Sequence, residues 1–120
     1  MSGPWKTLET HPVLIVDDVA EAVAFYEGLG FEEAFRNDIV YAVLRFGEHY
    51  VHLGTKMDGD GVGKSQAVIQ MRDVDQYYEY CVAQGATIHR EIEDRSYGLR
   101  DFYLADPCGN LVCFAEPMRA

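Results

Sequence analysis

An internal repeat at a spacing of 55 residues constrains the fold of this 120-residue chain more than any other feature. Segments 11–31 and 66–86 follow one plan, in which a short apolar run leads into an amphipathic stretch that ends at a glycine. The repeat aligns His11 with Gln66, Asp18 with Asp73, Val19 with Val74, Phe25 with Tyr80, and Gly30 with Gly85. Such self-similarity predicts a duplicated structural module, with function where the two copies meet.

The hydrophobic pattern predicts one strand, one helix and three further strands in each copy. Apolar residues fall at helical spacing after Asp18 and again after Asp73, and each stretch ends at a glycine suited to a helix C-terminus. Asp18 and Asp73 are expected to cap these helices. The predicted strands are 13–16, 31–37, 39–46, 49–54, 66–71, 86–92, 99–105 and 111–116, with a loop between the copies at 55–65.

Composition excludes several classes of protein. Twenty acidic and ten basic residues give a net charge of −10, which argues against a nucleic-acid partner and weakly favours a cationic ligand, or is simply a solvated acidic surface. No apolar run approaches the roughly 18 residues of a membrane span, and the N-terminus shows no secretory signal. We therefore expect a cytoplasmic protein, without a membrane partner, whose three cysteines are reduced thiols.

Two motifs identify a family. The first is Asp18 followed by Ala24-Phe25-Tyr26 and Leu29-Gly30-Phe31, and the second is the turn 106–110, Asp-Pro-Cys-Gly-Asn. Together they resemble the vicinal oxygen chelate superfamily of glyoxalases, bleomycin resistance proteins and dioxygenases. The resemblance implies an α+β fold in which two repeated βαβββ modules form a curved mixed sheet cup. The chain is expected to be a single domain, 1–120, with modules at about 11–55 and 66–117.

The resemblance also implies where a metal would sit. Metal-dependent members place ligands at four strand positions, which correspond here to His11, His52, Gln66 and Cys113. No carboxylate is among them, although a His-His-Gln-Cys set is conceivable for zinc. We therefore expect no cofactor and no metal. The alternative is a metal-dependent lyase, isomerase or dioxygenase with an unusual ligand set.

Among members without a metal, the chain is most similar to bleomycin resistance proteins. The similar stretches run from Phe35 to Tyr41, through Leu44 and Gly47-Glu48, and from Tyr97-Gly98 to the 106–110 turn. These relatives are dimers, not enzymes, and hold the flat drug in grooves between subunits by aromatic stacking. The implied partners are a bleomycin-like small molecule and a second copy of the chain, and the implied role is antibiotic resistance. The candidate ligand-binding residues are Tyr41, Arg45, His52, Tyr97, Phe102 and Cys113.

One hairpin allows a geometric test of this site. If Gly47-Glu48 is a two-residue turn, residues whose numbers sum to 95 face each other. Strand alternation then places five residues on one face, namely Tyr41, Val43, Arg45, Tyr50 and His52. Arg45 opposes a cationic ligand there unless it pairs with Glu48 or Asp101, and otherwise it suits an anionic ligand. The last hairpin leaves open whether Phe102 or Tyr103 shares the face of Cys113.

The sequence thus predicts a metal-free protein that binds and sequesters a flat hydrophobic or cationic small molecule. The enzyme named above is the first alternative. The second is an accessory domain that binds another protein through its dimer surface.

Overall fold

The computed structural model describes residues 3–37, 40–56 and 60–119. Two βαβββ units follow one another along the chain, as the repeat predicts. The first contains β1 (Val13–Ile15), α1 (Val19–Glu27), β2 (Glu32–Asn37), β3 (Tyr41–Phe46) and β4 (His49–Gly54). The second contains β5 (Gln66–Gln70), α2 (Val74–Ala83), β6 (Thr87–Asp94), β7 (Leu99–Ala105) and β8 (Leu111–Pro117). The predicted start of a strand at Ile39 lies outside the described residues.

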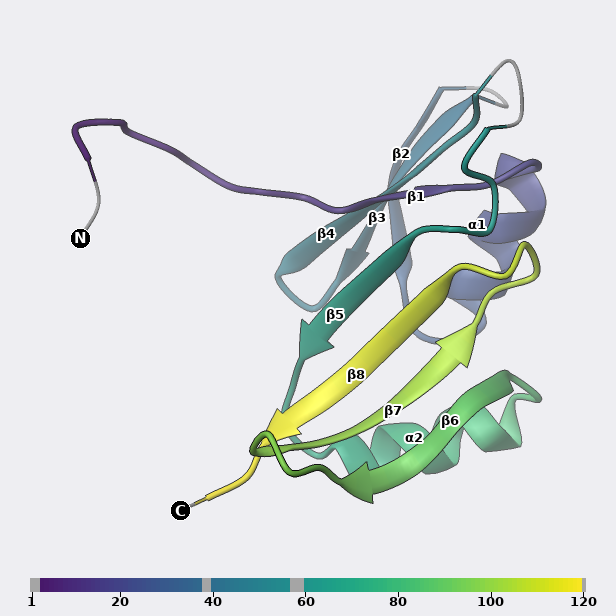
Figure 1. The fold of residues 1–120 in the computed structure, drawn as a ribbon. Helices are drawn as coiled ribbons and strands as arrows, with labels where there is room; N and C mark the ends of the chain where they lie inside the picture. The colour runs from purple at the N-terminus through teal and green to yellow at the C-terminus, as the bar shows by residue number, and fades with distance from the viewer. Residues whose placement is uncertain (1–2, 38–39, 57–59, 120) are drawn as a thin grey trace.

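Each unit forms its own four-stranded mixed sheet, and the two sheets have the same strand order (Figure 1). The orders are β1-β4-β3-β2 and β5-β8-β7-β6, with the first pair of each parallel and the others antiparallel. The predicted α+β class with two repeated modules is confirmed. The two-residue turn at Gly47-Glu48 is confirmed as well, since Phe46 pairs with His49 and Val43 with His52.

Strand register extends the repeat beyond the positions that sequence identity reveals. Val13 pairs with His52 in the first sheet, and its counterpart Val68 pairs with Cys113 in the second. His52 and Cys113 are therefore equivalent. By the same reasoning Tyr41 is equivalent to Asp101, because each pairs with the residue two places beyond its module's His52 or Cys113.

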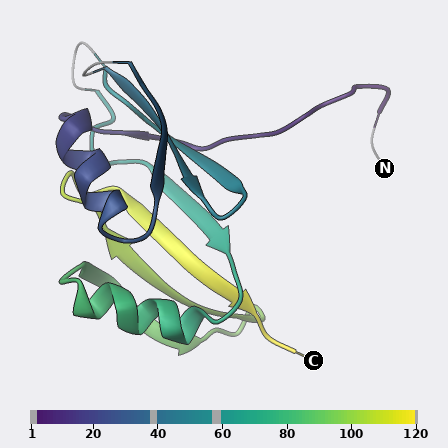
Figure 2. The same cartoon turned by 180° about the vertical axis from the view of Figure 1, so that it is seen from behind.

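Each helix covers one face of the sheet in its own module, and the core lies there (Figures 1 and 2). The predicted face of α1 is confirmed, since all of its apolar residues are buried, namely Val19, Ala22, Val23, Tyr26 and the adjoining Leu29. The opposite face of each sheet has no described helix against it. Large side chains on these open faces are exposed, such as Val13 and Phe35 in one sheet and Val68 in the other.

The 106–110 turn joins the two modules. Asp106 is buried and accepts a hydrogen bond from the Tyr26 hydroxyl of α1 at 2.9 Å. Burial is the main cause that raises the pKa of the Tyr26 hydroxyl, and the nearby charge of Asp106 is the second. The fully buried Asn110 donates from Nδ2 to the Ile15 carbonyl of β1 at 2.8 Å. A Cβ at Gly63 would stand 2.1 Å from the Cys108 carbonyl oxygen, so this crossing needs glycine. The family motif is thus a structural joint.

The second helix differs from its prediction at two points. Asp73 has a left-handed backbone, φ 58°, and its side chain makes no capping hydrogen bond. Glu116, at the end of β8, caps the helix instead by accepting from the Val74 amide at 3.1 Å. The helical spacing of apolar residues after Asp73 predicts Val82 on the apolar face of α2, but half of this side chain is exposed because the buried face runs through Val74 and Cys81. Asp18, by contrast, caps α1 as predicted, through the Glu21 amide at 3.0 Å.

Most of the N-terminal segment before β1 extends away from both sheets, whereas its last residues, His11 and Pro12, lie against β4 (Figures 1 and 2). Its two large apolar side chains, Trp5 and Leu8, are almost fully exposed. Neither described helix is long and apolar enough to cross a membrane.

Candidate functional site

Four hydrogen-bonded side chains form a network, the first network, on the open face of the first sheet. The Tyr41 hydroxyl meets His52 Nδ1 at 2.7 Å, and His52 Nε2 meets His11 Nδ1 at 2.9 Å. His11 Nε2 in turn meets Glu9 Oε1 at 2.6 Å. Two neutral imidazoles satisfy every contact if Tyr41 donates to His52, His52 to His11, and His11 to the Glu9 carboxylate. The first network thus links β3 to the N-terminal segment.

Local backbone features hold the first network in place. The His52 amide donates to the Pro12 carbonyl at 2.9 Å, which ties β4 to the start of β1. The Tyr41 ring lies over Gly54, where an added Cβ would stand 2.9 Å from Tyr41 Cε1. Glycine at this position therefore lets the ring turn toward His52. Burial is the main cause that lowers the pKa of His52, and electrostatic repulsion from His11 is the second. The lowered pKa favours the neutral form of His52 at pH 7.

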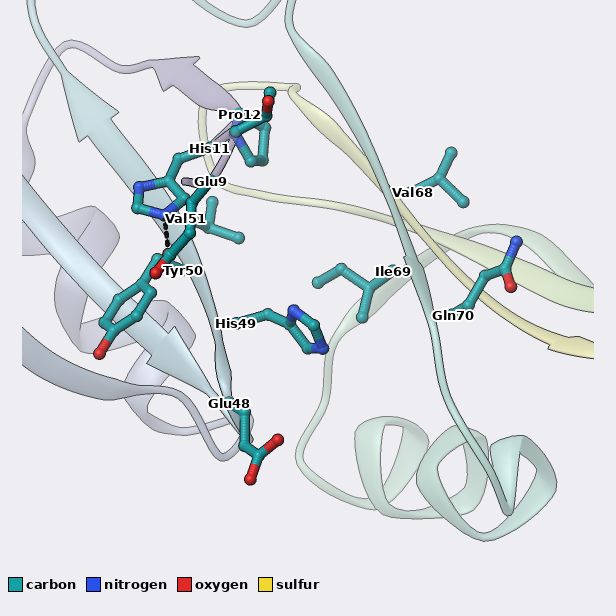
Figure 3. A pocket seen from close by; sticks show the side chains of 11 residues that line it. Glu9, His11, Pro12, Glu48, His49, Tyr50, Val51, Val68, Ile69 and Gln70 are labelled. Atoms are coloured by element: carbon teal, nitrogen blue, oxygen red, sulfur yellow. Dashed lines mark hydrogen bonds and ion pairs between the residues drawn. The ribbon is translucent and has the colours of Figure 1, made fainter. Parts of the chain in front are cut away.

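A hollow of about 550 Å³ lies between β4 and β5, next to the first network (Figure 3). Segments 9–12, 48–51 and 68–70 line it. The Tyr50 ring lies beside His11, with centroids 5.2 Å apart, and the side chains of His49 and Ile69 point toward one another across the hollow (Figure 3). His11 belongs to both the lining of the hollow and the first network, so the two are continuous.

The second sheet carries a different polar cluster on its open face. Asp101 is 1% exposed and accepts from Arg95 Nε at 2.7 Å and from the Tyr97 hydroxyl at 2.7 Å. Arg95, 7% exposed, also donates to Glu93 at 2.9 Å and to the Glu91 carbonyl at 2.7 Å. Hydrogen bonding to Asp101 raises the pKa of Arg95. These groups satisfy one another, so the cluster is a closed ion-pair network.

The structure places the predicted site residues in different surroundings. Tyr41 and His52 are in contact within the first network, and Tyr97 is exposed at the rim of the second sheet. Arg45 pairs with its cross-strand neighbour Glu32 at 3.2 Å, and not with Glu48 or Asp101 as considered from the sequence. That pairing turns its charge toward β2.

Phe102 is fully buried and stacks on Phe114 with centroids 5.4 Å apart, so its burial disagrees with a ligand-binding role. Tyr103 pairs with Cys113 and is the residue that shares its face. Cys113 is 1% exposed, and burial raises the pKa of its thiol to about 11. A buried, protonated thiol is a poor ligand contact and a poor nucleophile.

A metal ion does not fit the four positions that the resemblance implies. His11 and His52 contact one another, whereas Gln66 is exposed on β5 and Cys113 is buried in the second sheet. Among the described residues, no three His, Cys, Asp or Glu side chains come together in a way that could hold a metal. Within the described part of one chain, these four positions therefore do not form such a centre.

Sequence reasoning missed three residues of these networks. Glu9 stands two places before His11, outside the repeat, and no pattern marks it. Asp101 could have been noticed through its equivalence to Tyr41, but that equivalence depends on the register of the last hairpin, which the sequence left open. Arg95 reaches Asp101 across a β6–β7 turn whose irregular pairing no periodicity predicts.

Two βαβββ modules with open sheet faces define the class of protein. The family model described as the Glyoxalase/Bleomycin resistance protein/Dioxygenase superfamily matches residues 10–114. The chain belongs to this superfamily.

Two kinds of relative accompany the family match. An uncharacterized protein of Mycolicibacterium smegmatis is 31% identical over 107 residues, covering 89% of this chain and 91% of that protein. A bleomycin resistance determinant encoded on the transposon Tn5 has a similar structure, with a TM-score of 0.80 and 23% identity over 92% of this chain and 98% of that one. A bleomycin-binding protein complexed with bleomycin aligns with a TM-score of 0.79 and 24% identity over the same shares.

Proposed function

We propose that the protein is a metal-free small-molecule-binding protein that sequesters a flat apolar or cationic ligand, in the manner of bleomycin resistance proteins. The observation that supports this most is the open face of the first sheet, where the Tyr41 and His52 rings are in edge-to-face contact with centroids 5.5 Å apart. Aromatic faces stack on flat ligands and contribute about 0.5–1.5 kcal/mol per pair beyond area burial. A role in antibiotic resistance follows if the ligand is a drug.

Charge supports the cationic part of the proposal. The net charge of −10 attracts cations over a distance of about a Debye length. The one arginine proposed for this face, Arg45, is paired with Glu32, which reduces its opposition to a cation. The proposed ligand-binding residues are therefore Tyr41, Arg45, His52 and Tyr97, whereas Phe102 and Cys113 are left out because both are buried.

We also propose that the protein acts as a homodimer. Both sheets leave a face uncovered, and the side chains there include the exposed Phe35, Val68 and Tyr97. Exposed apolar surface of this kind is typical of interaction sites. A second copy would cover both faces at once and would enclose a ligand between subunits.

Calorimetric titration with copper-free and copper-loaded bleomycin tests the proposal. We expect binding at micromolar protein, weakened at least tenfold in Tyr41→Ala and unchanged in the control Tyr80→Ala, whose ring lies on α2 away from the open face. The absence of heat with both forms of the drug would reject bleomycin as the ligand. A wild-type affinity retained in Tyr41→Ala would reject the site.

Elemental analysis separates this function from a metal-dependent enzyme. Protein purified without chelators is expected to hold less than stoichiometric zinc, nickel, manganese or iron. Stoichiometric metal that is lost in His11→Ala or His52→Ala would favour the enzyme instead.

A further inference from the structure

We propose that the hollow between β4 and β5 binds the charged end of an organic cation, with an aryl amidinium as the simplest example. The inference rests on the proposed function and deepens it, since it assigns the cationic group to a site beside the aromatic face. It also brings in Glu9, Glu48 and Tyr50, which the sequence did not select.

The charges that line the hollow are of one sign. Glu9 and Glu48 contribute carboxylates, and none of the described lining residues is lysine or arginine. Glu48 makes no side-chain hydrogen bond or ion pair with another described residue, and Glu9 uses one oxygen for His11. A free carboxylate, that of Glu48, and a half-used carboxylate, that of Glu9, therefore belong to residues that line the hollow. An amidinium matches them because its N–H groups pair with carboxylate oxygens.

The rings and walls of the hollow suit the flat part of such a ligand. The Tyr50 and His11 rings lie side by side at an interplanar angle of 41°, and a cation over the Tyr50 face would gain a cation–π contact. Val51 and Ile69 provide apolar surface on either side. A volume of about 550 Å³ falls within the usual range for small-ligand sites, roughly 300–1,000 Å³.

Continuity with the proposed ligand surface gives the hollow its role. His11 lines the hollow and contacts Glu9 at one nitrogen and His52 at the other, so the hollow and the Tyr41–His52 face share this residue. A ligand with its flat body on Tyr41 and its charged end at a carboxylate of the hollow would use both the aromatic face and the hollow. The arrangement selects cations over neutral molecules of the same shape.

Paired titrations with benzamidinium and benzamide test the proposal, because the two molecules have nearly the same shape and differ in charge. Titration is followed by NMR of the full chain. We expect at least tenfold tighter binding of benzamidinium, weakening several-fold as ionic strength rises from about 0.02 M to about 0.3 M. The double variant Glu9→Gln/Glu48→Gln is expected to remove this preference. The control Glu27→Gln/Glu79→Gln, with the same change in net charge at two exposed helix positions, should retain it.

Equal binding of the two molecules, or a preference that survives in Glu9→Gln/Glu48→Gln, would overturn the cation site. Neither result depends on bleomycin, so failure here is distinguishable from failure of the proposed function. A preference lost in Tyr41→Ala but kept in the glutamate double variant would also overturn it, while supporting the aromatic face. Chemical-shift changes centred on Tyr50 and His49 are the expected fingerprint.

Discussion

The two modules share one backbone plan and place opposite kinds of polar network at equivalent positions. Tyr41 in the first module joins two imidazoles that end at an exposed glutamate, whereas its equivalent Asp101 joins a buried arginine. The first network borders a hollow through His11. The second is closed, and its partners satisfy each other. The first network therefore ends at an exposed carboxylate beside a hollow, whereas the second satisfies its own buried polar groups.

Substitution at the joint between the modules is expected to have the largest effect. Gly63→Ala places a Cβ 2.1 Å from the Cys108 carbonyl oxygen and adds strain at φ +73°, so the unfolding free energy should fall by about 4 kcal/mol. Gly61→Ala shares the positive φ but meets nothing closer than 3.8 Å, and should cost about 1 kcal/mol. Chemical denaturation measures both. Equal losses would show that the close approach does not hold the modules together.

Matched substitutions at the equivalent positions test the difference between the networks directly. Asp101→Asn removes the buried carboxylate partner of Arg95, leaves it only the exposed carboxylate of Glu93, and should lower the unfolding free energy by about 3 kcal/mol. Tyr41→Phe removes one hydrogen bond on a half-buried face and should cost about 1 kcal/mol. Urea midpoints of the two variants provide the comparison. A larger loss for Tyr41→Phe would reverse the assignment of roles.

The helix caps provide a smaller test. Asp18 caps the first helix and Glu116, from a distant strand, caps the second, so Asp18→Ala and Glu116→Ala should each cost about 1 kcal/mol. Asp73→Gly should leave stability unchanged or slightly raise it, because φ 58° suits glycine and no cap is lost. Thermal unfolding distinguishes these cases. A loss at Asp73→Gly as large as at Asp18→Ala would restore the sequence-based cap.

The smallest expected effect is a pH dependence specific to the first network. The pKa of His52 is lower in the folded chain than its unfolded value of 6.5, so the unfolded chain binds more protons there. Its contribution to stability is present above pH 6.5 and is lost as pH falls below it. His52→Gln should flatten the fall of the melting temperature between about pH 7 and pH 5. An unchanged slope in this variant would place the pH dependence elsewhere.

Much of the fold could be predicted because the repeat and the two motifs are local patterns. The strand and helix order, the Gly47-Glu48 turn and the buried face of α1 all follow from periodicity and turn chemistry. The cap at Asp73 was wrong because Glu116 arrives from β8, a contact that no local pattern contains. Glu9 and Arg95 were missed for the same reason, since their partners depend on register and on the path of the N-terminal segment.

The candidate site was less predictable than the fold. Strand alternation placed Tyr41 and His52 on one face, and the structure brings them within 2.7 Å. Alternation could not choose between Phe102 and Tyr103, because the choice depends on the length of the 106–110 turn. The pairing of Arg45 with Glu32 depends on the register of β2, which sequence periodicity did not supply.

Mapping a ligand onto the two sheets is the most direct test of the central claim that the first module carries most of the proposed ligand surface, to which the second adds Tyr97. NMR titration with copper-free bleomycin is expected to shift the amides of Tyr41, Tyr50 and His52 most strongly, with the Arg95–Asp101 region less affected. Shifts centred on Arg95 and Asp101, or no shifts in the presence of excess drug, would contradict the account.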